Sequence, residues 1–384
     1  RAVLEYFDAV KIGLTATPAL HTAEIFGTPV FSYSYREAVI DGYLIDHEPP
    51  IRPVTALAED GMTWHVGEDV EYFDPKTGQL NLAQAPDEIK VDVAQFNRKV
   101  ITPEFNRVVC DFLAEQIDPD MGKTLIFCVN NDHADLVTNL LKDSMQKRYG
   151  SINDDDVKKI TGASDQPMQL IRRYKNEASP KIAVTVDLMT TGIDVPEICN
   201  LVFLRRVKSR ILYEQMLGRA TRLCDEIDKT FFRVFDPVGL YQAISEFSTM
   251  KPVVVNPKIS FAQLIDELTA VSEPSAAGEI LDQLVAKLQR KKRHLSEAQT
   301  EGIERLAGMP ANEVADYLKQ CEALEAASWF EQRQQIAKLL DRRDGGGNPM
   351  LVSYHADELR RVEQGFGVAE DGTEYGKPED YLES

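Results

Sequence analysis

Apolar runs and amphipathic segments alternate through the middle of the chain. A continuous apolar run predicts a buried strand at 124–129, and strand-like segments follow at 157–161, 181–186, 200–204 and 230–236. Between them, apolar residues recur at helical spacing in 104–117, 133–149, 166–176 and 209–219. Strands that are apolar on both faces and alternate with helices are typical of a parallel sheet covered by helices on both faces. The pattern therefore predicts an α/β domain over 101–257.

The pattern changes on both sides of this domain. After it, strand signals nearly vanish and helical periodicity predicts an all-α domain over 258–384. Its helices are expected at 259–268, 277–293, 296–307, 312–324 and 328–340, followed by a glycine-rich loop at 342–349. Before the α/β domain, an acidic segment at 31–100 with several turn signals predicts a connector of hairpins and loops, extended at 30–35. A short buried strand is expected at 10–16.

Composition narrows the class of protein. The chain has 384 residues, 43% of them hydrophobic, enough for two or three domains with separate cores. No apolar run reaches the roughly 18 residues of a membrane helix, and the first residues lack the order of a signal peptide. We therefore expect a cytoplasmic protein without membrane contact, and the missing initiator Met predicts a segment of a longer protein. Five scattered cysteines favour free thiols, and six dispersed histidines predict no metal site.

The net charge of −19 taken alone argues against nucleic-acid binding, but the charges are unevenly distributed along the chain. Residues 121–260 carry 20 basic and 17 acidic residues, whereas 1–120 carry 9 and 21 and 261–384 carry 14 and 24. Because DNA binding depends on local basic surface, the middle of the chain is the expected place for it.

The strongest candidate for chemistry is the motif Gln215-x-x-Gly218-Arg219-x-x-Arg222. Placed on a helix that follows a parallel strand, the two arginines project from nearly the same face. A planar guanidinium stays charged and binds pairs of oxygen atoms, so these arginines suit a phosphoryl group during transfer. Gly218 would permit a neighbouring backbone to approach closely. The alternative is a surface helix with ordinary salt-bridging arginines.

A second motif, TTGIDVP (190–196), follows the strand expected at 181–186. Its Thr191, Gly192 and Asp194 are predicted at the carboxyl edge of the sheet, where α/β proteins bind ligands. A glycine turn with an aspartate cap is the alternative at this position. A third motif, LTATP, is by itself only a strand end with small hydroxyl residues. It becomes a candidate functional motif because it precedes the other two in the sequence.

These motifs, in this order, resemble the motor of helicase superfamily 2. The similar segments are LTATP (14–18), TLIFCVNNDHADLV (124–137, motif IV), TTGIDVP (motif V) and QMLGRATR (motif VI). The resemblance implies two RecA-like lobes that clamp ATP, the first holding phosphates and Mg²⁺ and the second supplying arginine fingers. It implies that 1–30 are a remnant of the first lobe and that 101–257 are the second RecA-like lobe.

The resemblance also implies roles for single residues. Arg219 and Arg222, with Gln215 beside them, would be catalytic, since an arginine finger contributes roughly 10³–10⁵ in rate, or about 4–7 kcal/mol. Residues expected to bind nucleotide or to couple the lobes and DNA are Thr191, Gly192, Asp194, Thr15, Ala16 and Thr17. Many members of the superfamily carry another arginine where this chain has Met216, so no finger is assigned there.

Longer runs are similar to the R subunits of type I restriction enzymes. They are IGLTATPALHTAEIFGTPVFSYSYREAVIDGYLIDHEPP (12–50), VTVDLMTTGIDVPEICNLVFLRRVKSRILYEQMLGRATR (184–222) and KPVVVNP (251–257). The resemblance implies an ATP-dependent translocase that feeds cleavage of unmodified DNA, with double-stranded DNA and the modification and specificity subunits as partners. It implies that the helical domain holds the modification enzyme. The Mg²⁺ site and the nuclease would lie outside this chain, which alone should not hydrolyse ATP.

Basic residues in the middle of the chain are candidates for DNA contacts. Arg205, Arg206 and Lys208 follow a predicted strand and could grip phosphates. Thr161 and Gly162 also follow a strand and resemble a backbone-contacting TG loop of the superfamily. Solvated loops are the alternative in both places. Weaker candidates of the same kind are Arg172, Arg173 and Lys175.

Two patterns imitate other sites. MGKTL (121–125) imitates a phosphate-binding loop, but Ile117 stands where that loop requires glycine, and the pattern precedes a strand instead of following one. Asp74 with residues 88–90 (Glu-Ile-Lys) imitates a nuclease centre, but it lies in the acidic connector, where we expect no strands to hold it and favour a solvated loop.

Two other functions stay open. A superfamily 2 helicase of repair or another defence system would share the motifs, but not the 12–50 run or binding to a methyltransferase. A non-catalytic interaction fragment would have lost the need for the arginine motif. The intact Gln215, Arg219 and Arg222 argue against such decay.

Overall fold

The computed structural model describes 6, 9–10, 12–15, 20–53, 62–64, 69–74, 79–84, 89–91, 101, 103–186, 194–207 and 209–342, with backbone alone for the strands within 62–91. The chain divides into two compact units. The first comprises Arg1–Val39 and Tyr43–Pro252, and the second comprises Ile40–Gly42 and Val253–Ser384.

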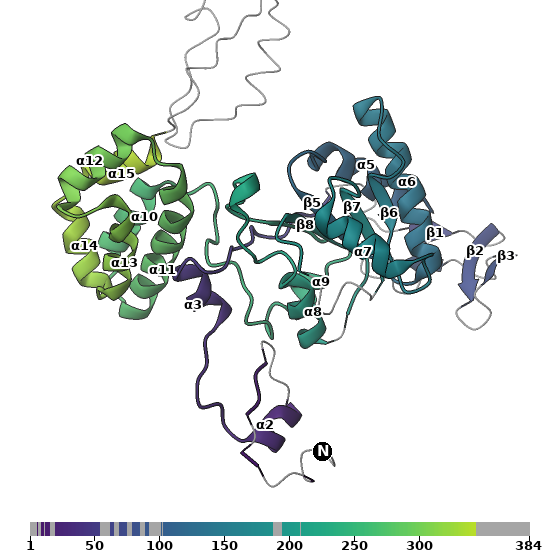
Figure 1. Ribbon diagram of the computed structural model, residues 1–384, viewed down its shortest axis with the longest axis horizontal. Helices are drawn as coiled ribbons and strands as arrows, with labels where there is room; N and C mark the ends of the chain where they lie inside the picture. The colour runs from purple at the N-terminus through teal and green to yellow at the C-terminus, as the bar shows by residue number, and fades with distance from the viewer. Residues whose placement is uncertain are drawn as a thin grey trace, which may run out of the picture. The chain divides into compact units, whose positions relative to one another are not determined.

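A five-stranded sheet forms the centre of the first unit (Figure 1). Its strands are β5 (Lys123–Phe127), β6 (Val157–Lys159), β7 (Ile182–Thr185), β8 (Ile198–Phe203) and β9 (Arg233–Phe235). They lie in the order β6-β7-β5-β8-β9, and every neighbouring pair is parallel. Each strand falls within or across one of the predicted strand segments, so the predicted parallel sheet is confirmed.

Helices cover both faces of this sheet. They include α5 (Pro103–Gln116), α6 (Asn131–Tyr149), α7 (Pro167–Asn176), α8 (Arg210–Leu217) and α9 (Leu240–Ile244), with the short η3 (Asp225–Ile227). The ring of Tyr213 on α8 lies 5.6 Å from that of Phe203, whereas Phe112 on α5 lies 6.2 Å from Phe235. Phe235 is in register with Val202, the neighbour of Phe203, so the two contacts lie on opposite faces.

The edge strand β9 is covered by part of the segment expected to be a connector. The Glu48 N–H donates to the Phe232 carbonyl at 3.1 Å, and the Ile51 N–H donates to the Val234 carbonyl at 2.8 Å. His47 also forms a parallel bridge to the residue before β9. These bonds occupy backbone groups that an edge strand would otherwise leave open.

The rest of the acidic segment contains the expected hairpin structure. The strands β2 (Asp69–Asp74) and β3 (Gln79–Gln84) pair antiparallel, as do β1 (Met62–Trp64) and β4 (Ile89–Val91). Residues 30–34 lie outside helices and strands, and the helix α3 (Tyr35–Ile40) follows them. The helix α2 (Leu20–Phe26) precedes them.

The buried strand predicted at 10–16 is wrong for the residues that the structure describes there. Val10, Ile12 and Leu14 are almost fully exposed and belong to no strand. Among the described residues, no strand pairs with this segment, and a lone strand leaves its backbone N–H and C=O groups without partners. Apolar character alone cannot create the neighbour that a strand needs.

The second unit is all-α over its described residues 253–342, as predicted (Figure 1, green to yellow). Its helices are α10 (Phe261–Ala270), α11 (Pro274–Lys291), η4 (Lys292–His294), α12 (Glu297–Ala307), η5 (Ala311–Glu313), α13 (Val314–Gln320), α14 (Ala323–Glu331) and α15 (Gln335–Asp341). The predicted helices at 312–324 and 328–340 have wrong boundaries. Cys321 and Glu322 adopt extended backbone angles, which end α13 and start α14 earlier than the periodicity indicated.

Candidate functional site

The TTGIDVP segment crosses the sheet instead of staying at one edge. It connects β7 to β8, and β5 lies between these two strands, so the chain must pass from the carboxyl end of β7 to the amino end of β8. Thr191 and Gly192 lie outside the described residues. Asp194 is described and stands shortly before β8. The expected place at the carboxyl edge is therefore wrong for Asp194, which lies toward the amino ends of the strands.

The arginine motif reaches the same side because α8 runs back from the carboxyl end of β8. Ser209 caps the helix, and its Oγ accepts a hydrogen bond from the Leu212 N–H at 3.3 Å. The helix ends at Leu217, so Arg219 and Arg222 lie in the turns beyond it. The prediction that both arginines project from one helical face is therefore wrong.

Arg222 and Asp194 join the two motifs directly. The Nε of Arg222 lies 2.8 Å from the Oδ1 of Asp194, with side chains that are 54% and 43% exposed. Arg219 is half-buried beside this pair. Its burial and the nearby Arg222 lower the pKa of the Arg219 guanidinium, whereas Asp194 acts in the opposite direction. Two arginines thus share the neighbourhood of one carboxylate.

Lys229 completes this group, and the sequence interpretation missed it. Its side chain donates to the carbonyls of Pro196 at 2.9 Å, Ala220 at 2.7 Å and Arg222 at 3.0 Å. The residue is 4% exposed, and burial lowers the pKa of its ammonium to about 8. We call Asp194, Arg219, Arg222 and Lys229 the arginine cluster. A single lysine in a short loop before β9 carries no periodicity or motif that could have marked it.

Lys229 also holds the backbone of the turn that follows α8. A continuing helix would direct the carbonyls of Ala220 and Arg222 toward N–H groups of the next turn. Both carbonyls instead accept from the Lys229 ammonium. The arginines consequently sit on a turn whose backbone is fixed from outside the helix.

A second missed residue, Glu214, anchors α8 from its buried side. Its carboxylate accepts from the Ser248 Oγ at 3.2 Å and from the Thr249 N–H at 2.9 Å, and it pairs with Arg210 at 3.0 Å. Glu214 belongs to the buried face of α8. A charged residue on an otherwise apolar face is the signal that could have revealed it. Gln215, the neighbouring candidate, is half-buried on the same helix.

Gly218 does not have the role that the sequence suggested. A Cβ at this position would meet the carbonyl oxygen of Glu214 at 3.2 Å, and the other atom within 4 Å also belongs to the preceding turn. The space that a side chain would need is therefore taken by the end of α8. Within the described residues, no neighbouring backbone approaches it.

The Thr161–Gly162 turn follows β6 at the carboxyl end of the sheet. The buried Thr161 donates its N–H to the Ser164 Oγ at 3.0 Å, and its own Oγ1 accepts from the Ala163 N–H at 3.3 Å. Gly162 is exposed, with open space where a side chain would stand. The turn is held from within and presents its backbone outward.

The basic segment after β8 is partly engaged inside the unit. The Arg206 guanidinium donates to the carbonyls of Val238 at 2.6 Å and Gly239 at 3.3 Å. Arg205 donates to the carbonyl of Val186, the last described residue before the TTGIDVP segment, at 3.3 Å. Lys208 lies outside the described residues. The DNA-binding assignment of these three residues stays a prediction.

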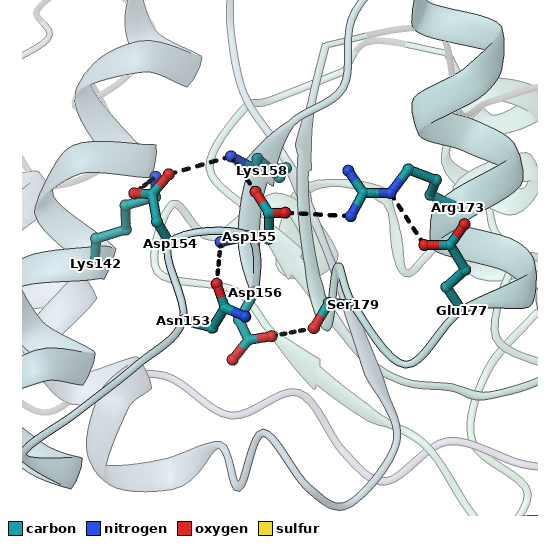
Figure 2. Close-up of polar contacts among 9 residues, drawn as sticks. All are labelled: Lys142, Asn153, Asp154, Asp155, Asp156, Lys158, Arg173, Glu177 and Ser179. Carbon is teal, nitrogen blue, oxygen red and sulfur yellow. Dashed lines mark hydrogen bonds and ion pairs between the residues drawn. The ribbon is translucent and has the colours of Figure 1, made fainter.

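A second group of charged residues lies near the amino ends of β6 and β7 (Figure 2). We call it the balanced cluster, and its members are Lys142, Asp154, Asp155, Lys158, Arg173 and Glu177. Hydrogen bonds from lysines lower the pKa values of Asp154 and Asp155. Arg173, a weaker candidate for phosphate contact, bonds Glu177 at 3.0 Å and Asp155 at 3.2 Å. Its guanidinium already has two carboxylate partners.

The remaining sequence candidates have different outcomes. Thr15 is exposed, and Ala16 and Thr17 lie outside the described residues. In the MGKTL imitation, the buried Lys123 donates to the carbonyls of α7 and of the residue after it, which keeps it away from any phosphate. The expectation of no strands around Asp74 is wrong, because Asp74 belongs to β2 and Lys90 to β4. These two strands lie in separate sheets, so no single sheet holds both residues.

Other expectations concern metals, thiols and membranes. All five cysteines are free, as predicted. Within the described part of the chain, no group of three or more His, Cys, Asp or Glu side chains could hold a metal ion. Among the helices that the structure describes, none is long and apolar enough to cross a membrane.

The geometry agrees with a known domain family. Residues 106–224 match the helicase conserved C-terminal domain, a region that contains the sheet from β5 to β8, Asp194 and both arginines. The first unit therefore contains a helicase conserved C-terminal domain, built on a parallel sheet with helices on both faces.

More similar proteins narrow this class. The chain is 41% identical to the endonuclease subunit of the type I restriction enzyme EcoKI from Escherichia coli K12, over 100% of this chain and 35% of that subunit. It is 28% identical to the EcoAI endonuclease subunit from Escherichia coli, over 72% of this chain and 35% of that subunit. A solved fragment described as an HsdR subunit of a type I restriction enzyme from Vibrio vulnificus YJ016 covers 65% of this chain and 44% of the fragment, with a TM-score of 0.48 and 24% identity.

The chain is thus related along its whole length to the endonuclease subunits of type I restriction enzymes. It spans about a third of the length of the curated relatives that it matches.

Proposed function

We propose that this chain is the second motor lobe and part of the helical domain of a type I restriction enzyme R subunit. In that subunit it would take part in ATP-driven translocation along double-stranded DNA, which leads to cleavage of unmodified DNA. The relationship to type I endonuclease subunits supports this assignment. The observation that carries it is the arginine cluster, in which Arg222 pairs with Asp194, Arg219 stands beside this pair and Lys229 bonds the backbone of both motifs.

Two guanidinium groups close together on a partly exposed site favour a polyanionic ligand. Arg222 is paired with Asp194, and Arg219 stands half-buried next to this pair. The triphosphate of ATP offers the oxygen pairs that guanidinium groups bind, and charge develops on these oxygens during phosphoryl transfer. Arg219 and Arg222 would stabilise that charge, and Gln215 would stand beside them as the third catalytic candidate.

The Arg222–Asp194 pair supports a coupling between ATP and DNA. Asp194 belongs to the same TTGIDVP motif as Thr191 and Gly192. This motif follows β7 in the sequence, and Asp194 stands shortly before the amino end of β8. The candidate DNA contacts also follow the carboxyl ends of strands. They are Thr161, Gly162, Arg205, Arg206 and Lys208. A change at the arginines would reach the DNA side through one crossing segment, and Thr15, Ala16 and Thr17 would couple this lobe to the first.

The proposal includes parts that this chain does not supply. A Mg²⁺ ion would be bound by the first motor lobe, as the resemblance to helicase superfamily 2 implies. The modification and specificity subunits would be the protein partners, and the complex would work in the cytoplasm. The chain alone is expected to hydrolyse no ATP.

The test is ATP hydrolysis by the full-length subunit, wild type and Arg219→Ala, with and without its modification complex on unmethylated DNA. We expect wild-type activity to require both the complex and DNA. Arg219→Ala should lower the rate a hundredfold or more, which corresponds to about 3 kcal/mol. Activity that ignores the complex would indicate a free-standing helicase, and an unchanged Arg219→Ala would refute the site assignment.

A further inference from the structure

Lys229 connects two motifs through their backbones. Of its three carbonyl partners, Pro196 lies in the TTGIDVP segment, whereas Ala220 and Arg222 lie in the arginine motif. An ammonium has three N–H donors, and three carbonyls surround this one at 2.7–3.0 Å. The side chain is therefore matched in number and distance to the acceptors around it.

The three carbonyls belong to residues at or near the side chains of Asp194, Arg219 and Arg222 in the sequence. Ala220 directly follows Arg219, and Arg222 carries the guanidinium that pairs with Asp194. Pro196 stands two residues after Asp194 in the sequence. Fixing these carbonyls fixes the backbone from which all three side chains project. Lys229 is only 4% exposed, so a bound nucleotide would meet the arginines and not the lysine.

We propose that Lys229 is a positioning residue for ATP hydrolysis, which holds the turn that carries Arg219 and Arg222 against the segment that carries Asp194. This inference rests on the proposed function. Lys229 contributes through geometry, since arginines that act on a transition state must be held close to their productive positions. A misplacement of about 1 Å is enough to cost roughly a hundredfold in rate.

Another buried lysine of the same unit provides the control. Lys123 donates to the carbonyls of Tyr174 at 2.5 Å and Glu177 at 2.6 Å, and it pairs with Glu197 at 3.3 Å. Its carbonyl partners lie at the end of α7 and touch no member of the arginine cluster. Lys123→Met therefore removes a comparable set of buried hydrogen bonds without releasing the arginine turn.

The experiment measures DNA-dependent ATP hydrolysis by the full-length subunit in its complex, with Lys229→Met and Lys123→Met made separately. We expect Lys229→Met to lower kcat by about tenfold or more while KM for ATP changes by less than about threefold, the pattern of a lost transition-state interaction. Lys123→Met should keep kcat within about threefold. An equal loss of kcat in both variants would mean general destabilisation and overturn the proposal.

A double variant separates positioning from independent damage. In the Arg219→Ala background, Lys229→Met should cost much less than in the wild type, because part of what it positions is already gone. Full multiplication of the two losses would overturn the proposal. If Arg219→Ala alone leaves the activity intact, the proposed function fails; if it is inactive and Lys229→Met is not impaired, only this inference fails.

Thermal unfolding checks that each variant is folded. If Lys229→Met does not fold, Lys229→Arg takes its place, because it keeps a cation with N–H donors but imposes the planar geometry of a guanidinium. We expect Lys229→Arg to fold, to lose kcat without a matching change in KM, and to show the same reduced effect in the Arg219→Ala background. Wild-type kcat in this variant would refute the need for the tetrahedral ammonium.

Discussion

The two charged clusters of the first unit lie near the amino ends of strands on opposite sides of β5, and they differ in how their charges are matched. In the balanced cluster near β6 and β7, three cations face three carboxylates of the cluster in a chain of exposed ion pairs (Figure 2). In the arginine cluster near β8 and β9, Asp194 is the carboxylate that acts on two arginines. The first cluster is held together by ion pairs between side chains, whereas the second is held through hydrogen bonds from Lys229 to backbone carbonyls.

The comparison also shows how burial separates structure from function. Arg173 bonds two carboxylates at the surface, and such exposed pairs contribute little to stability. Arg219 is half-buried beside Arg222, and burial and this like charge lower the pKa of its guanidinium. An arginine whose pKa is perturbed in this way is the better candidate for a functional role.

The largest expected difference is between one arginine of each cluster. Arg222→Ala should lower DNA-dependent ATP hydrolysis by roughly a hundredfold or more, because it removes both a finger and the link to Asp194. Arg173→Ala should leave the rate within about twofold, because it breaks only surface ion pairs. Rates of the full-length complex on unmethylated DNA decide this. Equal losses in both variants would remove the functional distinction between the clusters.

The anchoring of α8 should show the next largest effect, on stability. Glu214→Ala removes a buried carboxylate and leaves the donors of Ser248 and Thr249 unsatisfied, which we expect to cost about 2–3 kcal/mol. Glu177→Ala in the balanced cluster should change the stability little, because its side chain is more than half exposed. Denaturant unfolding of the two variants provides the comparison. Equal midpoints would show that burial does not distinguish these carboxylates.

The clusters should also respond to pH in different ranges, and in both ranges the stability should rise with pH. The pKa of Lys229 falls from 10.5 to about 8 on folding, so the unfolded chain binds more protons between these values and stability should rise with pH there. The pKa values of Asp154 and Asp155 are lowered, so their stabilisation is present above the ordinary carboxyl range and is lost as acid protonates them. Thermal midpoints across pH, compared with those of Lys229→Met, test the first trend. The alkaline rise should flatten in that variant.

Salt should produce the smallest effect. Asp155→Asn removes an exposed partner of Lys158 and Arg173, so its midpoint should lie slightly below that of the wild type at low salt. Near 1 M salt, where the Debye length is about 3 Å, the difference should disappear. A difference that persists at high salt would mean that this cluster is bound by more than screened surface charge.

Part of the fold and of the site could be predicted from the sequence. Apolar and strand-like segments located all five strands of the parallel sheet, and the spacing of Gln215, Arg219 and Arg222 selected the arginine motif before any contact was known. The predicted strand at 10–16 was wrong because a strand needs a neighbour, which local apolarity does not supply. The helix expected through residue 219 was also too long, because beyond Leu217 the N–H groups of Arg219 and Ala220 bond carbonyls three residues back instead of four.

The sequence by itself determined which side chains carry charge and chemistry, since residue type and local spacing are properties of the chain. Only the tertiary structure decided that Asp194 meets Arg222 and that Lys229 joins their backbones across gaps of 33 and 7 residues. The physical reason is that Lys229 binds carbonyl groups, which every residue possesses. A contact to a group common to all residues leaves no mark in the sequence, and it appears only when folding brings the backbones together.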